Sequence, residues 1–230
     1  MLNQNLLFLR NMITDKIAFD FLGLHLLEPM ALITNWMMSI FSIYAFFNLK
    51  ILKNEDVRNW KKFFLWFGIS TFFGGLGHLF FNYFDIPGKF PNWITGIISG
   101  YYAGKAVIVN LNDKLLQKKY ELFLILKGSI LLLASIATKK FVFVAVDAIF
   151  TYLLFCGFIA YSLYKKGFEE LKYMIFGVLV CVPSIFIFFF KINPHTWLNK
   201  DDLSHLLMLS CIVFFYIGAK KRSEIKSLNN

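Results

Sequence analysis

The sequence predicts an all-α membrane protein in which seven helices cross the bilayer, and three observations support this fold class. The 230 residues are 58% hydrophobic with a mean hydropathy of +0.60, whereas a soluble domain is about 45–50% apolar. The apolar residues form seven runs of roughly the 20 residues that cross a bilayer as a helix. The basic residues lie mainly in alternate loops, as in multi-pass membrane proteins.

The first element is predicted to be an N-terminal interfacial segment, residues 1–27. The apolar stretch at residues 6–9 is too short for a signal peptide, and charged residues interrupt the sequence after it. We therefore expect a helix that lies at the membrane surface and leads into the first span.

Residues 28–230 are predicted to form the seven-helix transmembrane domain. Its apolar runs lie at about 29–49, 63–84, 92–111, 120–138, 141–164, 171–190 and 201–219. The loops between them are short, so consecutive helices should be antiparallel neighbours. The Gly-Gly-Leu-Gly stretch at residues 74–77 falls inside the second run, where it favours close helix packing rather than phosphate binding.

The charges predict the orientation. A net charge of +10 would indicate a nucleic-acid partner in a soluble protein. Here 15 Lys and Arg residues lie in the loops after the first, third, fifth and seventh runs, and 7 lie on the other side. The positive-inside rule therefore puts the N-terminus outside and the C-terminus in the cytoplasm. We expect a multi-pass protein of the bacterial inner (cytoplasmic) membrane. Its expected partner is membrane lipid, and we expect it not to bind nucleic acid.

Several single residues have plain structural interpretations. The tryptophans lie near the ends of runs, where aromatic anchors contact the membrane interface: Trp36, Trp93 and Trp197 at the outer ends and Trp60 and Trp66 at the inner end. Lys105 and Lys127 lie toward the cytoplasmic halves of their runs, from which their side chains should reach the interface. The three cysteines lie inside apolar runs without metal-binding spacing, and we interpret them as small apolar residues.

The seventh run begins with charged groups, which are expensive in a membrane and usually pair, bind a ligand or carry out chemistry. Asp201 and His205 are four residues apart, and Asp202 and His205 are three apart, so either pair shares one face of a helix. The plain alternatives are that Asp202 caps the helix and that His205 hydrogen-bonds a neighbouring helix.

Polar residues from distant parts of the chain are predicted to reach the same depth. Glu28 opens the first span, with Thr34 and Asn35 about two turns deeper, and His78 lies six residues before the outer end of the second. Asp147 lies about two turns into the fifth span from the same side and is a further candidate for a shared cavity. A polar contact between helices is an equally plain interpretation of Asp147.

The residue types and spacing at this depth suit a zinc site. Two ligands one helical turn apart converge on one ion, so we expect His78, Asp202 and His205 as metal ligands. Glu28 and Asp201 are the expected catalytic groups or alternative ligands. A zinc-bound water with a pKa near 7 would be the nucleophile.

Two motifs resemble those of the alkaline ceramidase and adiponectin/progestin receptor superfamily. They are Gly-Gly-Leu-Gly-His78 in the second run and Asp201-x-x-x-His205 in the seventh. The chain resembles more closely an uncharacterised bacterial family of seven-helix membrane proteins. That likeness covers Glu28-Pro29 with Leu32, Thr34 and Asn35, then His78 with its glycines, then Asn199, Asp202, Leu203 and His205.

The resemblance implies a zinc-dependent membrane hydrolase that cleaves a lipid amide or ester at the extracytoplasmic end of the bundle. Two positions depart from the ceramidase pattern: Asp201 replaces a His, and Gly74 replaces a Ser one turn before His78. Ser70, Thr71 or Thr34 would have to supply the missing hydroxyl. The alternative is a non-enzymatic sensor or transporter that uses the same acid and His cluster.

Overall fold

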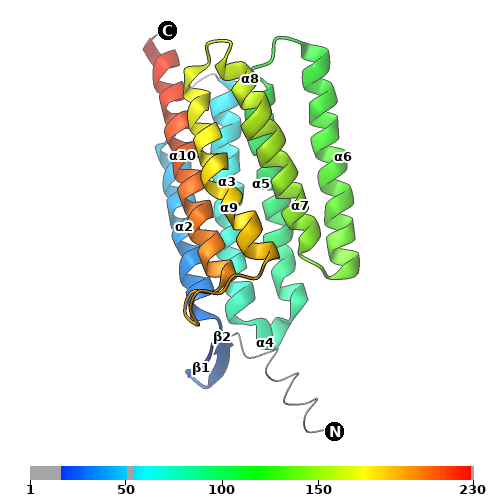
Figure 1. Cartoon of the computed structure of the whole chain (residues 1–230), viewed down its shortest axis with the longest axis vertical. Helices are drawn as coiled ribbons and strands as arrows, with labels where there is room; N and C mark the ends of the chain where they lie inside the picture. The colour runs from blue at the N-terminus through cyan, green and yellow to red at the C-terminus, as the bar shows by residue number, and fades with distance from the viewer. Residues whose placement is uncertain (1–16, 51–53, 229–230) are drawn as a thin grey trace.

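Long helices that run along one axis make up most of the chain (Figure 1). The computed structural model describes residues 17–50 and 54–228. The long helices are α2 (Pro29–Asn48), α3 (Glu55–Leu79), α5 (Phe90–Ile108), α6 (Lys114–Thr138), α9 (Lys172–Phe189) and α10 (Lys200–Leu228). Between α6 and α9, the segments α7 (Val142–Phe150), the π-helix η2 (Thr151–Ile159) and α8 (Ala160–Tyr164) form one continuous rod. Short helices occur at α4 (Phe81–Phe84), η1 (Ile86–Lys89) and η3 (Glu169–Leu171).

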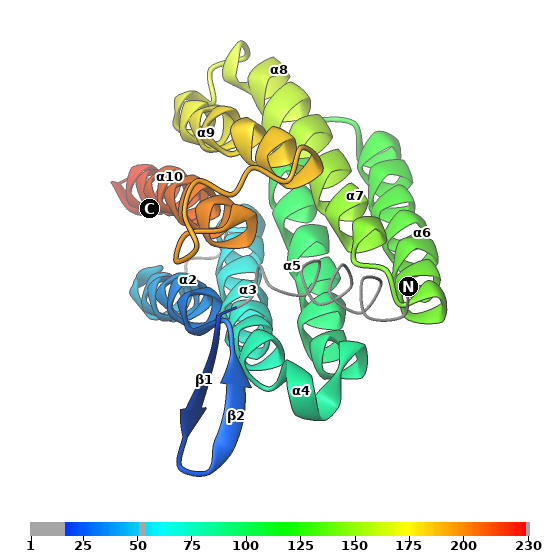
Figure 2. The same ribbon diagram turned by 60° about the horizontal axis from the view of Figure 1, so that its bottom comes forward.

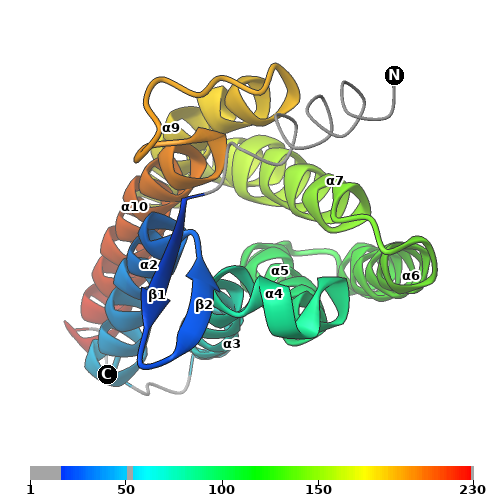
Figure 3. The same cartoon turned by 90° about the horizontal axis from the view of Figure 1, so that it is seen from below.

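Seen along the bundle, each long helix or rod lies against the next in sequence, and α10 closes the ring against α2 (Figure 3). This confirms the expectation that short loops make consecutive helices neighbours. The helix α3 has the most buried residues, whereas α6 buries only Leu124, Gly128 and Ser135. Asp113 caps α6 by accepting hydrogen bonds from the backbone N–H groups of Leu115 and Leu116.

Five helices of the described chain are long and apolar enough to cross a membrane. They are Pro29–Asn48, Lys114–Thr138, Val142–Tyr164, Glu169–Phe189 and Lys200–Glu224. The helices α3 and α5 have a less apolar composition because both carry several glycines and polar residues. Large apolar side chains on the outside of the bundle, such as Phe47 and Leu133, are 72% and 68% exposed. Extensive apolar exposure of this kind agrees with a membrane protein.

The end of the predicted N-terminal segment is a β-hairpin rather than a helix. The strands β1 (Ala18–Phe21) and β2 (Leu24–Leu27) pair antiparallel and project from one end of the bundle (Figure 2). Leu22 and Gly23, with φ values of 51° and 77°, make the tight turn that reverses the chain. The helix prediction is therefore wrong for residues 18–27, and its earlier part, residues 1–16, lies outside the described residues.

The prediction of interfacial tryptophans is wrong for Trp60 and Trp93, which are both 2% exposed. The Trp60 ring packs edge-to-face against Phe63 in the main core. The Trp93 ring packs against Phe90 and Phe141 in a second, smaller cluster. Both rings therefore fill volume between packed side chains of the protein.

Candidate functional site

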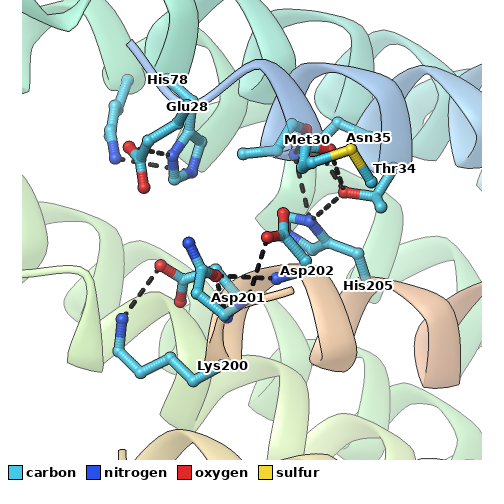
Figure 4. A network of polar contacts seen from close by, with 12 residues as sticks. Glu28, Met30, Thr34, Asn35, His78, Lys200, Asp201, Asp202 and His205 are labelled. Atoms are coloured by element: carbon cyan, nitrogen blue, oxygen red, sulfur yellow. Dashed lines mark hydrogen bonds and ion pairs between the residues drawn. The ribbon is translucent and has the colours of Figure 1, made fainter. Parts of the chain in front are cut away.

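The polar residues predicted to share one depth come together at the end of the bundle that carries the hairpin, which we call the hairpin end (Figure 4). Glu28 joins the hairpin to α2, His78 lies in the last turn of α3, and His205 lies near the start of α10. The rings of His78 and His205 face each other edge-to-face with their centroids 6.3 Å apart. Three segments that are distant in the sequence therefore form one cluster.

Glu28 fixes the orientation of His78. Its carboxylate Oε2 lies 2.9 Å from His78 Nδ1, and the side chain of Glu28 is only 3% exposed. Glu28 itself has φ 51° and ψ 59°, a left-handed conformation uncommon outside glycine. On the opposite side of the imidazole, Lys89 Nζ lies 3.5 Å from His78 Nε2. Both ring nitrogens of His78 thus contact a charged side chain.

His205 is held from one side by two residues of α2. Thr34 Oγ1 lies 2.9 Å from His205 Nδ1, and Asn35 Nδ2 lies 3.3 Å from the same nitrogen. Thr34 and Asn35 are themselves buried and hydrogen-bonded to backbone carbonyls one turn earlier. This arrangement leaves His205 Nε2 as the nitrogen available to another ligand.

The two aspartates at the start of α10 have different surroundings. Asn199 accepts hydrogen bonds from the backbone N–H groups of Asp201 and Asp202 through its side-chain oxygen, at 2.8 and 3.1 Å. Asp202 Oδ2 accepts one in return from the Asn199 backbone N–H at 3.1 Å. This reciprocal pair is a helix cap, so the capping interpretation of Asp202 holds. Asp201 instead pairs with Lys200 at 3.0 Å and lines a cavity.

That cavity has a volume of about 210 Å³ and extends from the cluster into the middle of the helix ring. His205, Asp201 and Asn35 line it near the hairpin end. Phenylalanine and aliphatic side chains of α7, η2 and α9, with Phe141 just before α7, form much of its wall: Phe141, Val144, Ile149, Leu153, Val178, Val182, Ile185, Phe188 and Phe189. A space of this kind suits an apolar chain with a polar head.

Asp147 also lines the cavity, as the sequence suggested. It forms an ion pair with Lys127 of α6, in which Lys127 Nζ lies 2.6 Å from Asp147 Oδ1, with the side chains 9% and 4% exposed. Lys127 also donates to the Asp147 backbone carbonyl and to Thr151 Oγ1. The expectation that Lys127 reaches the membrane interface is therefore wrong. Lys105 likewise pairs with Glu121, at a more exposed position.

The sequence matches the family described as "Family of unknown function (DUF6962)" over residues 30–224. The chain belongs to the DUF6962 family. No curated protein and no solved structure matches it. The matched segment of this DUF6962 protein contains every candidate site residue except Glu28, which precedes it by two residues.

The donor types in this DUF6962 protein fit zinc, but their present arrangement is a hydrogen-bonded one. Both histidines have Nδ1 engaged by a protein group, an arrangement that commonly orients zinc-binding imidazoles through Nε2. Nevertheless, among residues 17–50 and 54–228, no three His, Cys, Asp or Glu side chains lie close enough together to hold a metal ion. Lys89 contacts His78 Nε2 and Lys200 contacts Asp201, so an ion would have to displace both ammonium groups.

Sequence reasoning missed three participants in the DUF6962 site. Lys89 lies in a loop between predicted spans, and only the fold brings it to His78. Asn92 lines the cavity but comes after a proline at the start of a predicted span, where it resembles an ordinary loop residue. Lys127 pairs with a residue 20 positions away, and the apolar pattern of α6 gives no sign of its direction.

Proposed function

We propose that this DUF6962 protein is a multi-pass membrane protein with seven spans that hydrolyses an amide or ester bond of a membrane lipid. In this proposal α3 and α5 are the spans that complete the set, because they have 25 and 19 residues and lie between spanning neighbours in the ring. The hairpin end is the extracytoplasmic end, since the loops on the other side carry most of the basic residues.

The observation that carries the proposal is the cavity that joins the polar cluster to apolar walls. A lipid placed there would have its head beside His205 and Asp201 and its chain along Phe188 and Phe189. Binding the chain would place the scissile bond beside the polar groups, and such positioning is a large part of enzymatic rate enhancement. The enclosing helices also limit access of bulk water, which strengthens electrostatic interactions at the cluster.

Within this proposal, His78, His205 and Asp201 would hold a zinc ion, which supplies an activated water at neutral pH. Asp201 takes the position that the sequence assigned to Asp202, because Asp201 lines the cavity and Asp202 caps the helix. Glu28 orients His78 rather than acting on the substrate, since its carboxylate faces the imidazole.

The test uses purified protein in dodecyl maltoside with two probes, 4-nitrophenyl laurate and the lauroyl amide of 7-amino-4-methylcoumarin. Zinc content is measured by mass spectrometry on the same samples. We expect hydrolysis of at least one probe and about one zinc per chain, both lost in His78→Ala and His205→Ala. His195→Ala is the matched control, because His195 is exposed in the loop before α10 and lies outside the cluster. Wild-type protein with neither zinc nor hydrolysis would overturn the proposal.

A second candidate function, a proton-linked sensor or transporter, is favoured by the ionisable chain Glu28–His78–Lys89. Three titratable groups in contact, beside the cavity-lining His205, can exchange a proton with a ligand or with water. This function predicts proton movement into vesicles that contain the protein, measured with an internal pH-sensitive dye, and its loss in Glu28→Gln. A wild-type signal equal to that of empty vesicles would contradict it.

A further inference from the structure

Polar side chains line one wall of the cavity inward from His205. They come from three helices: Asn35 of α2, Ser70 of α3 and Asn92 of α5. Around them the wall is largely apolar, and Phe67, one turn before Ser70 in α3, is part of it. Polar groups in apolar surroundings need hydrogen-bond partners. The hydrogen bonds that these side chains make within the protein therefore show which of their atoms remain available to bind a ligand.

Ser70 sets the orientation of the Asn92 amide. The Ser70 hydroxyl lies 2.6 Å from Asn92 Oδ1 and 3.0 Å from the Asn92 backbone carbonyl, and it donates to these oxygens. Ser70 is 4% exposed, and Gly96 leaves room for it, since a Cβ at position 96 would lie 3.1 Å from Ser70 Oγ. With its oxygen engaged by Ser70, the Asn92 amide directs its NH₂ group the other way.

The Asn92 NH₂ group faces Gly74 and Asn35. A Cβ at position 74 would lie 3.0 Å from Asn92 Nδ2 and 2.8 Å from Asn35 Oδ1, so the absence of a side chain at Gly74 keeps a gap open between the two amides. Asn35 is the residue whose Nδ2 lies 3.3 Å from His205 Nδ1. Within the part of the chain that the structure describes, no protein acceptor is bonded to Asn92 Nδ2. Asn92 is therefore a cavity-lining residue whose side-chain donor is held beside Asn35, the residue that contacts His205.

We infer that Asn92 binds the carbonyl oxygen of the substrate and stabilises the negative charge that develops on it, an inference that rests on the proposed hydrolysis. Water adds to the carbonyl carbon, and the C=O π electron pair moves to the oxygen, which accepts a hydrogen bond from Asn92 Nδ2. When that pair returns, the C–N or C–O bond breaks and the amine or alcohol leaves with a proton from the water. A preoriented donor in a cavity with few competing waters is suited to this role.

The kinetic test compares variants that remove the donor with variants that leave it. Asn92→Leu and the isosteric Asn92→Asp should lower kcat for 4-nitrophenyl laurate about 10²- to 10³-fold with little change in KM. Ser70→Ala should lower kcat by a smaller factor, because it frees the amide to rotate. Ser39→Ala is the matched control, since Ser39 is buried and donates to a carbonyl of the neighbouring helix, at Gly68, but is not among the residues that line the cavity. An Asn92→Asp enzyme with kcat within twofold of wild type would refute the inference.

An infrared measurement separates this inference from the proposed function. The probe is 2-dodecanone with a ¹³C-labelled carbonyl, added to protein in dodecyl maltoside, which has no carbonyl group of its own. We expect a band shifted to lower wavenumber in wild-type protein and in Ser39→Ala, and its loss in Asn92→Asp. A wild-type protein that hydrolyses nothing but shows this band would retain Asn92 as a carbonyl ligand. Identical spectra for wild type and Asn92→Asp would overturn it, whatever the activity.

Discussion

Replacing Lys127 with methionine should destabilise this DUF6962 protein by about 3–5 kcal/mol, the usual cost of removing one partner from a buried ion pair. The magnitude comes from the surroundings: the Lys127 ammonium contacts Asp147 Oδ1 at 2.6 Å, the Asp147 carbonyl at 2.9 Å and Thr151 Oγ1 at 2.6 Å. Methionine keeps most of the length of the side chain and removes the charge. Asp147, with a side chain 4% exposed, would then hold a carboxylate without its ammonium partner.

The assay is equilibrium unfolding by sodium dodecyl sulfate in mixed micelles, monitored by circular dichroism. Lys105→Met is the control, because its pair with Glu121 is 21% and 32% exposed and should contribute at most about 1 kcal/mol. The double variant Lys127→Met/Asp147→Leu should recover most of the loss, since it removes both charges. Equal destabilisation by Lys127→Met and Lys105→Met, or no recovery in the double variant, would refute the assignment of a buried ion pair.

Three further pairs of substitutions test the packing, the end of the bundle opposite the hairpin and the α10 cap by the same titration. Gly74→Ala places a methyl group 2.8 Å from Asn35 Oδ1 and should lower the free energy of unfolding by about 1–3 kcal/mol. Gly157→Ala is its control, because the added methyl group would have its nearest neighbour, the Tyr152 carbonyl oxygen, at 3.5 Å, and this variant should unfold as wild type does. Arg222→Met removes the guanidinium that pairs with the buried carboxylates of Asp56 and Glu170, and should lower the free energy of unfolding by about 3–5 kcal/mol. Arg222→Lys should recover only part of this stability, because one ammonium group cannot reach both carboxylates. Asn199→Ala should cost about 1 kcal/mol and Asn199→Asp much less, and equal losses in the two would contradict the cap.

The meeting of the candidate site residues could be anticipated because membrane depth restricts where a residue can lie. Once the apolar runs are placed, Glu28, His78 and Asp201 fall at the same level without any knowledge of packing. Depth does not specify rotation about the helix axis. It therefore left Asp201 and Asp202 interchangeable, and only the Asn199 cap separates the one that lines the cavity from the one that holds the helix.

The errors have a common physical origin in contacts between distant segments. The neighbours of Lys127 in the sequence are mostly apolar and give no partner for its charge. The partner is Asp147 on the next helix, and this ion pair keeps the Lys127 ammonium buried. Trp60 and Trp93 lie near the ends of runs but have neighbours that bury them. The hairpin turns at Leu22 and Gly23, which both adopt positive φ values. The segment is short and mixes apolar and charged residues, so its sequence does not distinguish a hairpin from a helix.

The cap of α10 has a consequence for large-scale mutagenesis. Asn199 and Asp202 line no part of the main cavity, yet they organise the turn that carries Asp201 and His205. In the proposed hydrolase, substitutions at the cap should therefore lower activity at near-normal abundance, a profile usually attributed to residues that touch the substrate. A scan that measures activity and abundance in the membrane together should include Asn199→Asp, which retains the capping oxygen, to separate loss of the turn from loss of the proposed chemistry.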